Sequence, residues 1–127
     1  RASGQRDSGE EMNSLKRAGE QAFNSVEKIN AELFVLTYGA MVSQLLSDYD
    51  TVEEVNTQLE QMGYNIGLRL VDEFLAKSGV GRCQSLKEAA EVVAKVGFKM
   101  FLGVTANVTH WNAEESEFSL VLDDNPL

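Results

Sequence analysis

The chain has 127 residues, enough for one small domain, and its 43% hydrophobic content is normal for a globular protein. Eleven basic residues against twenty acidic ones give a net charge of −9, which argues against binding to nucleic acid or to an anionic membrane surface. The longest uncharged run, residues 33–47, is shorter than the roughly 20 residues that a membrane-spanning helix needs.

The cysteine count and the two ends of the chain point to a fragment of an intracellular protein. A single cysteine cannot form an internal disulfide, which suits a reducing compartment. The first thirty residues lack the apolar core of a signal peptide. The chain begins with Arg1 and ends at Leu127 directly after a strand-like run, so we expect it to be truncated at its C-terminus.

The N-terminal third divides into a polar tail and an apolar helix. Residues 1–20 are polar and aperiodic, and we expect a disordered tail there, or a frayed helix start near Met12, followed by one domain over residues 21–127. Apolar residues recur every three or four positions from Phe23, which predicts a first helix ending near residues 48–50. Because this helix is apolar nearly all round, we expect a second subunit to cover it, with Leu36 and Val42 at the subunit interface.

A capping box opens the second helix. Thr51 and Glu54 have the serine/threonine-to-glutamate spacing of that motif, and the apolar stripe then continues through residues 62–77. We expect this helix to end near Ser78, with Gly79 in the left-handed conformation beyond it.

A second capping box, Ser85 to Glu88, opens a third helix that is expected to end near Leu102. Small residues at Ala90, Ala94 and Gly97 allow another element to approach closely, or leave a groove. The predicted inward face consists of Leu86, Ala89, Ala90, Val93, Val96, Gly97, Met100 and Phe101.

The C-terminal part alternates apolar and polar residues around Val108 and over residues 118–122. A polar loop at 112–116 joins the two runs, which predicts an antiparallel β-hairpin. The chain is therefore expected to be a bundle of three helices followed by a hairpin.

The turn between the second and third helices carries the only cysteine, Cys83, next to Arg82. A nearby cation favours the thiolate form of a cysteine, so Cys83 is a candidate nucleophile or modification site, although free cysteines are more often inert core residues. His110 is the only histidine, and a Cys83–His110 pair would make a thiol acyltransferase or hydrolase, but no third residue to orient the imidazole is evident. One histidine and one cysteine do not make a metal site.

Four segments carry a resemblance to a known family. Residues 32–45 (ELFVLTYGAMVSQL), 62–83 (MGYNIGLRLVDEFLAKSGVGRC), 95–105 (KVGFKMFLGVT) and 118–127 (FSLVLDDNPL) resemble the small subunits of the trafficking protein particle (TRAPP) complex. The resemblance covers the chain from about residue 29 to residue 127. It identifies the chain as similar to the founding subunit type of that family, without the C-terminal part.

The resemblance implies an α+β fold and a scaffold rather than an enzyme. Such subunits form homodimers or heterodimers with other small subunits through a helical face. The assembled complex tethers vesicles between endoplasmic reticulum and Golgi and acts as a guanine nucleotide exchange factor for a Rab GTPase. A cytoplasmic protein is implied, peripheral at the cis-Golgi and endoplasmic reticulum, which meets the membrane only through the complex.

The resemblance also implies a covalent palmitoyl-type acyl group and no other cofactor. Cys83 would carry the group as a thioester, and Arg82 would favour the thiolate. The acyl chain would lie in an internal channel, with Gly97 at a lining position that is usually alanine and with Ala90 and Ala94 on the same helix. A thiol enzyme using Cys83 and a plain helical dimerisation module remain the alternatives.

Overall fold

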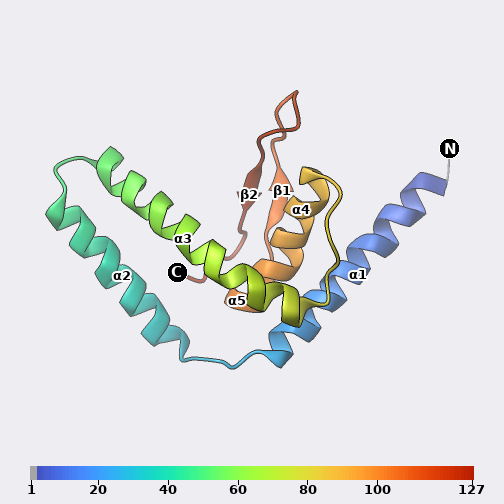
Figure 1. The fold of residues 1–127 in the computed structure, drawn as a ribbon, viewed down its shortest axis with the longest axis horizontal. Helices are drawn as coiled ribbons and strands as arrows, with labels where there is room; N and C mark the ends of the chain where they lie inside the picture. The colour runs from blue at the N-terminus through green and yellow to red at the C-terminus, as the bar shows by residue number, and fades with distance from the viewer. Residues whose placement is uncertain (1–2) are drawn as a thin grey trace. The chain divides into compact units, whose positions relative to one another are not determined.

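The computed structural model describes residues 3–127, with side chains from residue 8 onward, and has the expected α+β class (Figure 1). Three segments at the end of the helical part follow one another without a break and form one helix from Leu86 to Leu102, whose middle is a π-helical turn. The elements in order are α1 (Ser3–Ser25), α2 (Ala31–Asp48), α3 (Val52–Ser78), α4 (Leu86–Val92), η1 (Val93–Gly97), α5 (Phe98–Leu102), β1 (Asn107–Thr109) and β2 (Ser119–Val121).

The chain divides into two compact units. The first comprises the residues up to Val26 together with Phe74–Asn125, and the second comprises Glu27–Glu73 with Pro126–Leu127. In the first unit, α1 packs on η1 and α5, while β1 packs on α4 and η1. The helix from Leu86 to Leu102 is therefore the element on which this unit is built. The buried apolar residues of the unit are Ala22, Ala90, Val92, Ala94, Val96, Met100 and Ala106.

Helix α1 differs from the tail predicted over residues 1–20. The structure is helical from Ser3 onward, and residues 1–2 lie outside the part that it describes. Contacts at the C-terminal half hold α1: Ala22 is buried, and a Cβ on Gly19 would lie 2.5 Å from the carbonyl oxygen of Lys95. Such a close approach of two backbones requires glycine and comes from a residue far away in sequence, so local composition carries no sign of it.

The predicted first helix is in fact two helices. Helix α1 ends at Ser25, and α2 begins at Ala31 with Asn30 as its N-cap, whose side-chain oxygen accepts a hydrogen bond from the Leu33 amide at 2.9 Å. The helix is interrupted here and begins again with a cap, although the apolar pattern of the sequence continues through this point. The predicted end of the helix is confirmed at Asp48.

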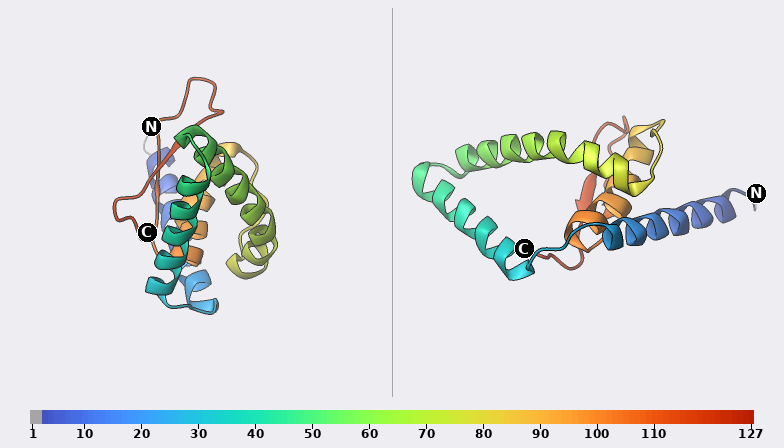
Figure 2. Two further views of the ribbon diagram at one scale, coloured as in Figure 1. Left: turned by 90° about the vertical axis from the view of Figure 1, so that its left-hand side faces the viewer. Right: turned by 60° about the horizontal axis from the view of Figure 1, so that its bottom comes forward.

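The second unit consists of α2 and most of α3, joined by a short connection. The two helices meet there and diverge away from it (Figure 2), and Leu45 and Val55 are the buried residues on either side. The capping box at the start of α3 is confirmed, because the Glu54 amide donates to Thr51 Oγ1 at 3.3 Å and the Thr51 amide donates to Glu54 Oε2 at 3.2 Å. Gly79 follows the end of α3 with φ of 66°, as predicted.

The π turn explains why the predicted inward face of the third helix is only partly correct. Its backbone bonds join residues five apart, as in the bond from the Phe98 amide to the Val93 carbonyl, so the side chains turn out of the register of an α-helix. Leu86, Val93 and Phe101 are exposed by 47%, 45% and 38%, whereas Ala90, Val96 and Met100 are buried as predicted. Ala94, one of the small residues assigned to that face, is also buried, whereas the buried residues Val92 and Lys95 were not assigned to it.

The β-hairpin is confirmed. Strands β1 and β2 are antiparallel, with Val108 paired with Leu120. Asn112 organises the loop between them: its Oδ1 accepts hydrogen bonds from the amides of Ser116 at 2.8 Å and Glu117 at 3.1 Å. Across residues 3–127, no helix is both long enough and apolar enough to cross a bilayer.

Candidate functional site

Cys83 lies in the turn between α3 and α4 and is half-buried. The turn is shaped at both ends by local signals. On one side the Val80 amide donates to Ser78 Oγ at 3.2 Å, and Gly79 takes the left-handed conformation that lets the chain leave the helix. On the other side Ser85 caps α4 by accepting from the Glu88 amide at 3.1 Å. The thiol is therefore held on a short connection between two capped helices.

Two charged side chains, those of Arg82 and Glu88, lie near the turn that carries Cys83, and neither forms a hydrogen bond with the thiol. Arg82 is exposed, and within residues 3–127 its guanidinium makes no hydrogen bond or ion pair. A carboxylate lies in the same turn, because Glu88 Oε2 accepts from the Gln84 amide at 2.6 Å. The activating role of Arg82 stays a prediction.

Two of the small residues assigned to the acyl channel are buried in the first unit. Ala90 is exposed by 1% and Ala94 by 0%, and the carbonyl of Ala94 accepts a hydrogen bond from the Ala106 amide at 3.0 Å. The small side chain of Ala94 thus lies where the segment leading into β1 approaches the helix. The assignment of Ala90 and Ala94 to the channel lining stays a prediction.

A Cβ would fit at Gly97 without a clash. A Cβ built on it meets one atom within 4 Å, Cε2 of Phe74 at 3.9 Å, which is an ordinary van der Waals distance. Gly97 is half-buried at the end of the π turn, and Phe74 belongs to the last turns of α3 in the same unit. A larger side chain at position 97 would extend toward Phe74 and fill the space in which the predicted acyl channel would run. Gly97 is therefore the position where the channel prediction can be tested most directly.

Lys95 is the residue that sequence reasoning missed. It is buried, with 6% exposure, and its ammonium donates to the Ala106 carbonyl at 2.6 Å and to Asn107 Oδ1 at 2.9 Å. Asn107 in turn donates to Asp123 Oδ2 at 3.0 Å. The lysine therefore joins the π turn to β1 and, through Asn107, to the segment that follows β2. Its only sequence signal is one charge within an apolar stretch, and that charge faces inward because the π turn rotates it.

The predicted interface residues lie on α2 in the second unit. Leu36 is exposed by 71%, and Val42 is half-buried. Leu33 and Leu46 on the same helix are exposed by 62% and 54%. A helix with this much apolar surface exposed in the single chain is suited to contact another protein.

His110 and Cys83 are not brought together by a hydrogen bond. His110 follows β1 with φ of 53°, is exposed, and has its Nδ1 2.9 Å from Thr109 Oγ1. In the described residues 3–127, no group of three or more histidine, cysteine, aspartate or glutamate side chains is arranged to hold a metal ion.

The sequence of this chain matches that of a known family. Residues 34–127, more than half of the chain, match the family model described as transport protein particle (TRAPP) component. The chain belongs to the TRAPP component family.

Within that family the chain is similar to subunit 3. It is 64% identical over 111 residues to trafficking protein particle complex subunit 3 of Dictyostelium discoideum, covering 87% of this chain and 60% of that protein. It is 50% identical over 116 residues to trafficking protein particle complex subunit BET3 of Saccharomyces cerevisiae, covering 90% of this chain and 60% of that one. The chain thus spans about 60% of the length of these curated relatives.

A solved structure shows the same fold. The crystal structure of trafficking protein particle complex subunit 3 from Naegleria fowleri, covalently bound to palmitic acid, superposes with a TM-score of 0.72 at 55% identity. The match covers 79% of this chain and 61% of that one. The resemblance read from the four sequence segments is therefore confirmed at the level of the family and the fold.

Proposed function

We propose that the chain is part of a scaffold subunit of the TRAPP vesicle-tethering complex and that a fatty acyl group is attached to Cys83. The observation that carries the second half is the covalent palmitate of the Naegleria fowleri relative, combined with the presence of one cysteine in this chain. That cysteine is half-buried on the turn that leads into α4, and a Cβ at Gly97, farther along the same continuous helix, would meet no clash. 

The modification is a thioester exchange with an acyl donor such as palmitoyl-CoA. The Cys83 sulfur attacks the carbonyl carbon, a new S–C bond forms, and the bond to the coenzyme A sulfur breaks. The cysteine proton ends on the released coenzyme A thiol, so the exchange needs no oxidant and no further reactant. Complete burial of the roughly fourteen methylenes of the acyl chain, at about 0.8 kcal/mol each, would contribute about 11 kcal/mol before ordering costs. A term of that size would retain the acyl group within the fold and away from a membrane.

The experiment is intact-mass measurement of the protein after incubation with palmitoyl-CoA at neutral pH. One acyl adduct that is removed by hydroxylamine, and is absent in Cys83→Ser, is expected. Arg82→Ala should slow the reaction if the cation acts on the thiolate. An adduct that persists in Cys83→Ser would refute the assignment.

The same incubation separates the alternatives. A thiol acyltransferase or hydrolase would release coenzyme A continuously, well beyond one equivalent, whereas a scaffold stops after one. A plain dimerisation module would gain no adduct at all. We propose a scaffold rather than an enzyme, and the amount of coenzyme A released in this assay tests that proposal.

The partners that we propose are other small TRAPP subunits, as homodimer or heterodimer, bound through α2. Leu36 and its exposed apolar neighbours on α2 support this. Through the assembled complex, the subunit would take part in nucleotide exchange on a Rab GTPase during transport from endoplasmic reticulum to Golgi. It would be cytoplasmic and peripheral at the cis-Golgi and endoplasmic reticulum.

A further inference from the structure

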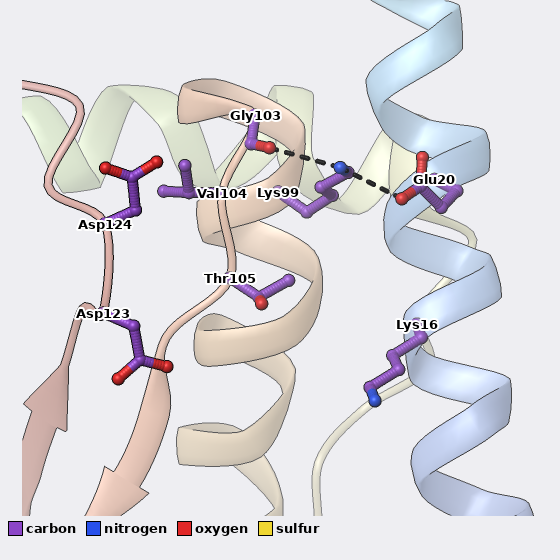
Figure 3. A pocket seen from close by; sticks show the side chains of 8 residues that line it. All are labelled: Lys16, Glu20, Lys99, Gly103, Val104, Thr105, Asp123 and Asp124. Carbon is purple, nitrogen blue, oxygen red and sulfur yellow. Dashed lines mark hydrogen bonds and ion pairs between the residues drawn. The ribbon is translucent and has the colours of Figure 1, made fainter.

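A cleft of about 430 Å³ lies in the first unit and is lined mainly by charged side chains (Figure 3). Helix α1, the end of α5, the link to β1 and the segment after β2 form its walls. The charged and turn residues around it are Lys16, Glu20, Lys99, Gly103, Asp123 and Asp124. The volume is within the range of about 300–1,000 Å³ of ligand sites, and five of the eight residues that line the cleft carry a charge.

Two of its charges already neutralise one another. Lys99 Nζ lies 3.0 Å from Glu20 Oε1 and also donates to the Gly103 carbonyl at 3.2 Å. The side chain of Lys99 is only 20% exposed, and its ammonium lies 5.2 Å from the ring centroid of Phe23. This pair is a fixed part of the wall and leaves little charge for a ligand.

Three other charged side chains line the cleft, those of Lys16, Asp123 and Asp124. Asp123 has its Oδ2 engaged by the Asn107 amide group at 3.0 Å. Among residues 8–127, whose side chains the structure describes, neither the Lys16 ammonium nor the Asp124 carboxylate makes a hydrogen bond or an ion pair. Figure 3 shows the Lys16 side chain reaching from α1 toward the side of Thr105, with Asp123 beyond Thr105 on the opposite wall. A cation and two carboxylates thus face one cleft without pairing with each other.

We propose that this cleft docks a segment of a partner polypeptide that carries a basic and an acidic side chain. The basic group would bind Asp123 and Asp124, where a guanidinium can form paired hydrogen bonds to a carboxylate, and the acidic group would bind Lys16. The net charge of −9 favours the approach of basic segments. A polypeptide is the expected class of ligand because members of this family are components of a protein complex. The site is distinct from Cys83 and goes beyond the proposed function.

The test uses a peptide of zero net charge, so that the overall charge of the protein cannot produce binding. The probe is acetyl-Arg-Gly-Gly-Glu-amide, together with versions that have one, three or four glycines, because the structure does not set the spacing. Binding is followed by NMR through the backbone amides of Gly103 and Thr105. We expect saturable shifts with at least one spacing, and none with acetyl-Gln-Gly-Gly-Gln-amide.

Single-charge variants then locate the binding. Asp124→Asn should weaken the affinity for the peptide by about threefold, which is the effect expected from the loss of one exposed ion pair. Glu114→Gln is the matched control, since Glu114 is an exposed acid of the hairpin loop and lies outside the cleft; it should leave the affinity unchanged. Lys16→Gln should abolish the preference for the glutamate peptide over acetyl-Arg-Gly-Gly-Gln-amide, which a merely structural role of Lys16 would not do.

Three results would overturn the proposal. The first is equal binding of the charged and uncharged peptides. The second is equal weakening by Asp124→Asn and Glu114→Gln, which would show that binding follows net charge alone. The third is a shift of the cleft amides by O-phosphoethanolamine but by none of the peptides, which would assign the cleft to a lipid headgroup.

Discussion

Replacing Lys95 with methionine tests the part of the fold that local sequence signals did not reveal. Methionine keeps an unbranched apolar stem but removes the ammonium, which donates to the Ala106 carbonyl at 2.6 Å and to Asn107 Oδ1 at 2.9 Å. Ala106 is 0% exposed, so its carbonyl would lose its partner without gaining water, at a cost of about 1–3 kcal/mol. Asn107 is exposed and can turn to solvent.

An opposing contribution reduces that cost. The buried ammonium is itself partly desolvated, and removing it relieves this penalty. We therefore expect Lys95→Met to lower the free energy of unfolding by about 1–2 kcal/mol, in the lower half of the range for an unsatisfied buried acceptor. The loss should be concentrated where the π turn holds the hairpin, so amide exchange in β1 should also become faster.

The assay is urea unfolding with Lys87→Met as the matched control. Lys87 lies 3.4 Å from Glu115, but the two side chains are 61% and 65% exposed, so the loss of that ion pair should cost less than about 0.5 kcal/mol. Equal unfolding midpoints for the two variants would show that the burial of Lys95 contributes nothing to stability, and the reasoning would fail.

Three further outcomes are expected. Gly19→Ala should destabilise the protein by about 1–3 kcal/mol, because the added Cβ would lie 2.5 Å from the Lys95 carbonyl oxygen. Gly9→Ala, where the added Cβ has no atom within 4 Å, should be neutral or stabilising, and thermal unfolding compares the two variants. Gly97→Leu should keep the helical circular dichroism signal but reduce acylation in the mass assay by about tenfold or more, since loss of burial of two methylenes costs about 1.6 kcal/mol; acylation to the wild-type extent would exclude the channel at that position. Leu36→Glu should separate the subunits in sedimentation, and a variant that remains dimeric would place the interface elsewhere.

Much of the site could be predicted because its signals are local. The capping box from Thr51 to Glu54 is confirmed by its two reciprocal hydrogen bonds, and Ser85 caps α4 as its spacing predicted. Gly79 ends α3 with a positive φ. Each of these depends on residues within four positions of one another, so the placement of Cys83 on a turn between two helices followed from sequence alone.

The missed features depend on residues far apart in the chain. Helix α1 replaces a predicted tail because Gly19 and Ala22 meet the π turn and α5, about eighty positions later. The break before α2 is a local signal, the Asn30 cap, that the continuing apolar pattern concealed.

The sequence by itself determined the hairpin, the two capped helix starts and the position of the single thiol, since capping, glycine conformation and apolar periodicity act over one or two turns. The family followed from the resemblance of four segments. Only the tertiary structure decided that Lys95 faces inward and that Lys16 shares a cleft with Asp123 and Asp124. A π turn shifts the faces of a helix with no distinct composition to mark it, and a cleft brings together charges that no spacing in the chain relates.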